Sequence, residues 1–141
     1  MKAIGYQQNL PIENELALQD IELEIPVAQG HDILVEVNAI SVNPADYKVR
    51  LGMPIPKGVW KVIGWDATGI VKSVGDNVTL FQPGDKVWYA GDITRSGSNA
   101  QLQLVDERIV GKMPESLSFG EAAALPLTSL TAWEMLFDRL E

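Results

Sequence analysis

Four polar side chains that could take part in hydrogen-bond or acid–base chemistry lie close together at Asn43, Asp46, Tyr47 and Lys48. The amide of Asn43 both donates and accepts hydrogen bonds, so it could hold a hydroxyl group or a substrate oxygen. Tyr47 or Lys48 could donate a proton to a substrate oxygen, and Asp46 could orient a neighbour. An ordinary explanation stands beside these: Asn43 and Asp46 suit the start of a helix over Pro44–Leu51. Exposed Tyr and Lys side chains mostly do no chemistry, and the pattern leaves both explanations open.

Three aromatic residues form a second group of candidates, as possible walls of a substrate pocket. Trp65 could form one wall for a flat molecule, or it could simply fill the core. Trp88 and Tyr89 are neighbours in a β-rich segment, so their side chains point to opposite faces of a strand. We expect one of this pair in the core and the other in a cleft.

The composition excludes several classes of function. The chain has no cysteine, which excludes disulfides and zinc sites built on thiolates, and its one histidine, His31, is expected in an exposed turn. The net charge of −8, from 11 basic and 19 acidic residues, argues against a nucleic-acid partner. No segment approaches the ~20 apolar residues of a membrane span, and none has the pattern of a signal peptide. These features predict a soluble cytoplasmic protein.

The first two thirds of the chain alternate short β-rich segments with turns such as Pro83-Gly84-Asp85. Many short strands with little helix favour a small barrel or sandwich. The expected strands are Lys2–Tyr6, Asp20–Ile25, Ile33–Val42, Val62–Val74, Lys86–Ala90, Gln101–Val105 and Arg108–Lys112.

The C-terminal part of the chain is predicted to be helical. Ser118 and Glu121 have capping-box spacing and open a short helix that Pro126 ends. A second helix over Thr128–Leu140 carries an apolar stripe, for which ordinary packing is the simplest explanation. The stripe consists of Leu130, Trp133, Leu136, Phe137 and Leu140. We therefore divide the chain into a domain over residues 1–125 and a linker helix over residues 126–141.

Four stretches in a fixed order resemble the N-terminal half of the medium-chain dehydrogenases/reductases. They are Asn43–Gly52, Ile63–Val71, Val74-Gly75 with Pro83–Val87, and Ala122–Trp133. The resemblance implies a mainly β, GroES-like and partly open barrel with helices at the C-terminal end. These residues contain no G-x-G-x-x-G motif, so the Rossmann domain to which the linker helix would lead is absent from them.

Departures from the zinc-dependent members point to a zinc-free branch of this superfamily. Zinc alcohol dehydrogenases have a cysteine where this chain has Asn43, and Gly-His-Glu where it has Gly64-Trp65-Asp66. The indole N–H of Trp65 is a donor only and cannot bind zinc, which leaves Asp66 as the one possible ligand at these positions. A polar loop over residues 91–99 stands where the four-cysteine lobe would be. The chain therefore resembles the quinone oxidoreductase branch.

That branch reduces quinones or α,β-unsaturated carbonyls by hydride transfer, usually from NADPH. Asn43 and Thr131 match family positions near the nicotinamide, although Thr131 could be an ordinary hydroxyl in a helix. Most contacts to NADPH would come from the absent domain, so these residues alone are expected to be inactive and to bind NADPH weakly. Two alternatives stay open: a related reductase acting on ketones or aldehydes, and a free-standing GroES-like binding module without enzyme activity.

The resemblance also bears on partners. A small quinone or enone substrate is expected, with no nucleic acid and no membrane. A surface that another domain would cover should favour self-association, most simply as a homodimer through the C-terminal helix.

We predict that the protein contains no stoichiometric zinc, because Asn43 and Trp65 occupy ligand positions and cysteine is absent. Elemental analysis of protein purified without a chelator should find under about a tenth of an equivalent, since a zinc site needs at least three protein ligands. A full equivalent that EDTA removes would contradict this prediction.

Overall fold

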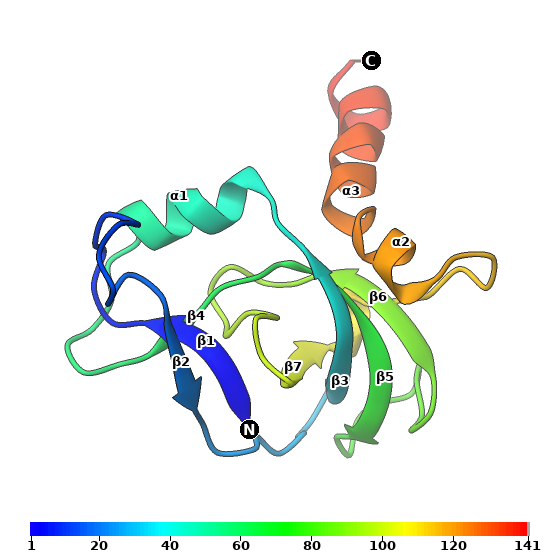
Figure 1. Ribbon diagram of the computed structural model, residues 1–141. Coiled ribbons are helices and arrows are strands. Elements are labelled where there is room, and N and C mark those ends of the chain that lie inside the picture. Colours follow the sequence, from blue (N-terminus) through cyan, green and yellow to red (C-terminus); the bar gives the residue numbers. More distant parts are fainter. Residues whose placement is uncertain (141) are drawn as a thin grey trace.

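The computed structural model describes residues 1–140, which form two antiparallel sheets that do not close into a barrel (Figure 1). Helices lie at the C-terminal end, as the sequence predicts. One sheet has the strand order β2-β1-β4, and the other has the order β7-β3-β5-β6-β8. The strands are β1 (Lys2–Tyr6), β2 (Gln19–Glu22), β3 (Asp32–Ser41), β4 (Lys61–Val62), β5 (Asp66–Val74), β6 (Lys86–Ala90), β7 (Leu102–Asp106) and β8 (Gly111–Lys112).

The core lies against the larger sheet. Ile33 and Val35 of β3, Val71 of β5, Val87 of β6 and Val105 of β7 are all buried and belong to one cluster. Burying an aliphatic side chain of this size stabilises a fold by roughly 1.5–3 kcal/mol. The central strands β3 and β5 are therefore anchored in the core by their buried side chains, and the residues at the strand ends are positioned by them.

The predicted strand over Val62–Val74 is wrong as one continuous element, because the chain breaks between β4 and β5. Gly64 has a φ of 109°, a conformation that side chains other than glycine rarely adopt. Its carbonyl accepts a hydrogen bond from the Ser98 amide at 2.9 Å, and a Cβ at this position would collide with the Ser98 side chain. A segment far along the chain thus bends the strand at Gly64.

The last predicted strand, over Arg108–Lys112, is also shorter in the structure. A 3₁₀ turn covers Glu107–Ile109, and only Gly111–Lys112 pairs as β8. The turn begins where the Asp106 carboxylate accepts a hydrogen bond from the Arg108 amide at 2.9 Å. A local cap therefore overrides the β pattern here.

The helices are α1 (Pro44–Gly52), α2 (Phe119–Ala123) and α3 (Pro126–Glu134), and a π-helical turn over Met135–Arg139 extends α3. Ser118 and Glu121 form the predicted capping box at α2. The helix α3 rises away from the sheets (Figure 1). The apolar stripe of α3 and its extension is not buried, contrary to the expectation of ordinary packing, because each of its five residues is at least half exposed.

His31, predicted as an exposed turn residue, pairs with a buried carboxylate. Its Nδ1 lies 2.8 Å from Oε1 of Glu107, which is only 2% exposed. The other oxygen of Glu107 accepts hydrogen bonds from the amides of Thr79 at 2.9 Å and Leu80 at 2.8 Å. The hydrogen bond with His31 first, and those from the two amides next, hold the pKa of Glu107 below its usual value. One carboxylate thus ties three loops together.

We predict that Glu107→Gln lowers stability at pH 7 and that its deficit shrinks as the pH falls from 5 to 3. The folded-state pKa of Glu107 is lowered, so its contribution is present above the unfolded-state pKa, ~4.3 for a Glu, and is lost on acidification. Denaturant melts across this range measure the difference from wild type. The exposed Glu115→Gln is the control, and a deficit that stays constant down to pH 3 would refute the prediction.

Candidate functional site

The candidate site is built around the carboxylate of Asp66, which is fully buried at the start of β5. Its Oδ2 accepts hydrogen bonds from Oγ of Ser41 at 3.0 Å and from Nδ2 of Asn43 at 2.7 Å. Its Oδ1 accepts one from the backbone amide of Leu127 at 2.7 Å. Three segments that are far apart in the sequence therefore meet at one side chain.

Local rules place each of these donors. Ser41 ends β3 directly opposite Asp66 in the antiparallel register. Asn43 is the N-cap of α1, with an extended backbone and Pro44 in the first turn. Proline at the start of α3 has no N–H, so the Leu127 amide is the first free donor of that helix. A carboxylate at a helix N-terminus is also favoured by the helix dipole.

Asp46 belongs to the same buried region as Asn43. It is 5% exposed, and its Oδ2 accepts a hydrogen bond from the backbone N–H of Asn43 at 2.7 Å. Burial raises the pKa of Asp46, backbone hydrogen bonds partly offset that rise, and the nearby charge of Asp66 raises it further. The structure thus brings Asn43, Asp46 and Asp66 together.

Tyr47 and Lys48 do not join this group. Both lie in α1 with exposed side chains, and Tyr47 is 53% exposed. Neither forms a side-chain hydrogen bond within residues 1–140. Proton donation by either residue stays a prediction.

Trp65 lies in the core beside the site. It is 3% exposed and packs in a cluster with Tyr6, Val49 and Ile63. Its indole Nε1 is buried, and no group among residues 1–140 accepts a hydrogen bond from it. The side chain belongs to this core cluster, and its role as a pocket wall stays a prediction.

Trp88 and Tyr89 point to opposite faces of β6, as their alternation predicts. Tyr89 is buried, its hydroxyl donates to Oε1 of Gln103 at 2.8 Å, and burial raises its pKa. Trp88 is half-buried and lines an apolar cavity of about 280 Å³ between β6 and α3. Leu130 and Trp133 line the same cavity from the helix. The candidate residues Trp88 and Tyr89 therefore line one pocket together with two residues of the apolar stripe.

Thr131 lies on the exposed surface of α3. Its Oγ1 donates to the carbonyl of Leu127 at 3.0 Å, which satisfies the hydroxyl within the helix. A cofactor contact by Thr131 stays a prediction. The hydroxyl is nevertheless linked to the site, because the amide of the same Leu127 donates to Asp66.

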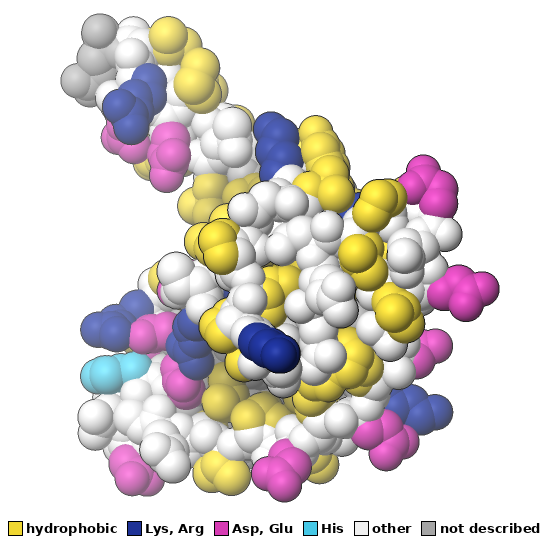
Figure 2. All heavy atoms as spheres, turned by 90° about the vertical axis from the view of Figure 1, so that its left-hand side faces the viewer, with side chains coloured by type: hydrophobic (Ala, Val, Ile, Leu, Met, Phe, Trp, Pro, Cys, Tyr) yellow, Lys and Arg dark blue, Asp and Glu magenta, His cyan; other side chains and the backbone are white. Residues whose placement is uncertain are grey.

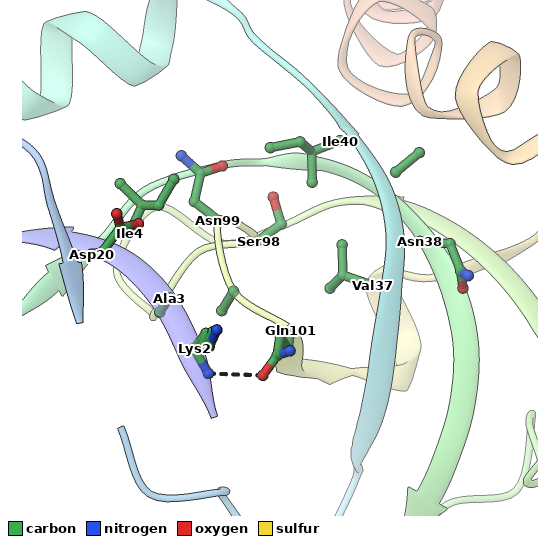
Figure 3. Close-up of a pocket in the computed structure, with 12 residues that line it drawn as sticks. Lys2, Ala3, Ile4, Asp20, Val37, Asn38, Ile40, Ser98, Asn99 and Gln101 are labelled. Carbon is green, nitrogen blue, oxygen red and sulfur yellow. Dashed lines mark hydrogen bonds between the residues drawn. The ribbon is translucent and has the colours of Figure 1, made fainter. Parts of the chain in front are cut away.

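A second hollow, of about 380 Å³, lies between β1 and β3 where the two sheets do not meet (Figure 3). Ile4 and Ile40 face it from its two sides, and Ser98 lies at its floor. Oγ of Ser98 is buried without a hydrogen-bond partner among residues 1–140. None of the residues predicted for the site lines this hollow, so it is separate from the Asp66 network.

The residues at this site do not fit zinc. No group of three or more His, Cys, Asp or Glu side chains that could hold a metal occurs within residues 1–140. Both oxygens of Asp66 already accept hydrogen bonds from protein donors, and Asn43 donates a hydrogen bond from its side-chain amide to that carboxylate.

Within residues 1–140, no helix has the length and apolar character needed to cross a membrane.

Comparisons with known proteins place these features in a wider group. Residues 29–128 match the family model of the alcohol dehydrogenase GroES-like domain. A zinc-type alcohol dehydrogenase-like protein from Staphylococcus epidermidis is 45% identical over 138 residues, which cover 98% of this chain and 40% of that protein.

Solved structures show the same fold. A Rhizobium etli protein assigned as a zinc-dependent alcohol dehydrogenase matches with a TM-score of 0.94 and 62% identity, over 98% of this chain and 40% of that one. Escherichia coli quinone oxidoreductase, solved with NADPH, matches with a TM-score of 0.85 and 28% identity, over 100% of this chain and 42% of that one. The chain thus spans about two fifths of the length of these proteins.

Proposed function

Because the chain belongs to the family of alcohol dehydrogenase GroES-like domains, we propose that it is the substrate-side domain of a zinc-independent, NADPH-dependent reductase. Its relatives are oxidoreductases of the alcohol dehydrogenase-like and quinone oxidoreductase kinds. The proposed substrates are quinones or α,β-unsaturated carbonyls. The observation that carries the proposal is the hydrogen bond of 2.7 Å between Asn43 and Asp66, two residues whose motifs resemble the zinc-ligand motifs of the zinc-dependent members.

The choice of substrate class follows from the chemistry of these residues. Oxidation of an alcohol in this superfamily relies on a metal to stabilise the alkoxide, and Asn43, Trp65 and Asp66 supply no adequate ligand set. Reduction of an electron-poor carbon needs mainly position and polarity from the protein. NADPH would supply the hydride.

Each candidate residue then has a proposed role. Asn43 and Thr131 would contact the nicotinamide side of NADPH. Asp46 would hold Asn43 in place through its hydrogen bond with the backbone N–H of Asn43. Tyr47 or Lys48 would donate a proton to the enolate or hydroquinone oxygen that forms after hydride transfer, since both side chains are exposed. Trp65, Trp88 and Tyr89 would shape the pocket for a flat acceptor. The rest of the cofactor site would come from a nucleotide-binding domain.

We predict that this chain supports quinone or enone reduction when it replaces the matching 40% of the Rhizobium etli relative, whose fold it shares at a TM-score of 0.94. The chimera should consume NADPH with 1,4-benzoquinone or methyl vinyl ketone, as followed by NADPH absorbance. Asn43→Ala should lower kcat/KM by about ten- to a hundredfold, the cost of one or two lost hydrogen bonds.

The exposed Asn38→Ala in β3, the strand that precedes Asn43, is the matched control and should leave kcat/KM unchanged. Calorimetry on the 141-residue chain alone should detect no tight NADPH binding. A chimera that oxidises alcohols, loses this activity with EDTA and ignores quinones would overturn the proposed function.

We also propose that the chain self-associates through α3 and its extension. Trp133 and Phe137 are 63% and 53% exposed, and their ring centroids lie 4.5 Å apart. Figure 2 shows hydrophobic side chains along this protruding helix. Such an apolar face can meet its own copy across a two-fold axis.

Sedimentation velocity should show a sedimentation coefficient that rises with the concentration of the chain. Phe137→Glu should shift this rise to at least about tenfold higher concentration, since it places a charge in the apolar contact. Val27→Glu, at a 74% exposed apolar residue far from α3 in the sequence, should leave the association unchanged. A monomer at every concentration, or equal effects of both substitutions, would contradict this assignment.

A further inference from the structure

We infer that Asp66 is a positioning residue that fixes α3 relative to Asn43 and so sets the separation between Asn43 and Thr131. The inference rests on the proposed function, in which both residues contact the cofactor. It goes beyond that proposal because it assigns a defined role to a fully buried residue that the proposed function leaves without one.

The first step concerns what stabilises the Asp66 carboxylate. The side chain is fully buried, and it takes part in none of the ion pairs formed within residues 1–140. A buried charge without an opposite charge persists only where several donors compensate it. Here the compensation comes from Ser41, Asn43 and the N-terminus of α3.

The second step concerns the division of these donors between the two oxygens. Oδ2 receives the donors of the β3–α1 segment, and Oδ1 receives the Leu127 amide of α3. The planar carboxylate therefore bridges two separate elements. A shift of α3 relative to α1 would break a hydrogen bond to a buried charge, which is costly.

The third step extends the connection to Thr131. Leu127 donates its amide to Asp66 and accepts a hydrogen bond from Oγ1 of Thr131 at 3.0 Å. Three hydrogen bonds and the backbone of Leu127 thus connect the Asn43 side-chain amide, through Asp66, to the Thr131 hydroxyl. The two proposed cofactor contacts are its two ends.

The fourth step explains why the bridge is rigid. Asp66 pairs with Ser41 of β3 on one side and with Ala90 of β6 on the other, so its backbone is held inside the sheet. The carboxylate can adjust only through its side-chain torsions. The separation of the two elements is therefore set from a backbone position that is paired on both sides.

The test compares Asp66→Asn with Glu107→Gln, the same change at another buried carboxylate with backbone and side-chain donors. In the chimera described above, Asp66→Asn should raise the KM for NADPH or lower kcat so that kcat/KM falls at least about tenfold. Glu107→Gln should lower stability and leave both constants within twofold. Ser41→Ala removes one donor and keeps the charge, so it should give a smaller change in the same direction.

A second measurement on the 141-residue chain needs no activity. Amide hydrogen exchange followed by NMR should be at least about tenfold faster at Leu127 in Asp66→Asn and unchanged there in Glu107→Gln. In Asp66→Asn the single side-chain oxygen would accept from Ser41 and Asn43, which leaves the NH2 group facing the Leu127 amide. Combining Asn43→Asp with Asp66→Asn reverses the pair and keeps an acceptor for Leu127, so slow exchange should return while activity does not.

The outcomes separate the two proposals. An inactive wild-type chimera with Asp66-dependent exchange at Leu127 removes the proposed function and retains the bridge. An active chimera in which Asp66→Asn behaves like Glu107→Gln overturns the positioning role. If Asp66→Asn does not fold, Ser41→Ala decides: exchange at Leu127 and kinetic constants both equal to wild type overturn the inference.

Discussion

The arrangement of this site depends on one buried carboxylate that has hydrogen-bond donors in place of a cation. Asp66 begins a central strand, and its three partners come from β3, the N-cap of α1 and the first turn of α3. Removing any partner would leave a charge less compensated in a poorly solvated region. The positions of α1 and α3 are consequently coupled, although the two helices come from distant parts of the sequence.

A second constraint is the surface that the fold leaves open. The two sheets do not close into a barrel, and α3 with its extension carries exposed aromatic and aliphatic side chains. The chain spans about two fifths of the length of its relatives. The rigid sheet core and the polar network at Asp66 are complete within these residues, whereas the apolar face of α3 is not covered by them.

Local patterns were sufficient to predict much of the fold. Alternation and turn residues predicted β1 and β6 with their observed bounds, and the Ser118–Glu121 spacing predicted the cap of α2. The break at Gly64 and the pairing of His31 with Glu107 were missed, because both depend on contacts between distant segments. The sequence also placed Asn43 and Asp46 together, but it gave Asp66 no role beyond that of a residual metal ligand. A charged residue at the start of a strand of buried residues was the available signal, since such residues are rarely buried without partners.

The chemistry of the network shows how the Asp66 carboxylate is stabilised by protein donors alone. Zinc sites hold several anionic or neutral ligands around a positive ion. Here the Asp66 carboxylate lies at the centre and its three hydrogen-bond donors are neutral, with the positive end of the α3 dipole on one side. Asn43 fits this reversed arrangement because its amide donates where a thiolate could only accept. Asn43 and Asp66 therefore stabilise each other as a donor and a buried anion.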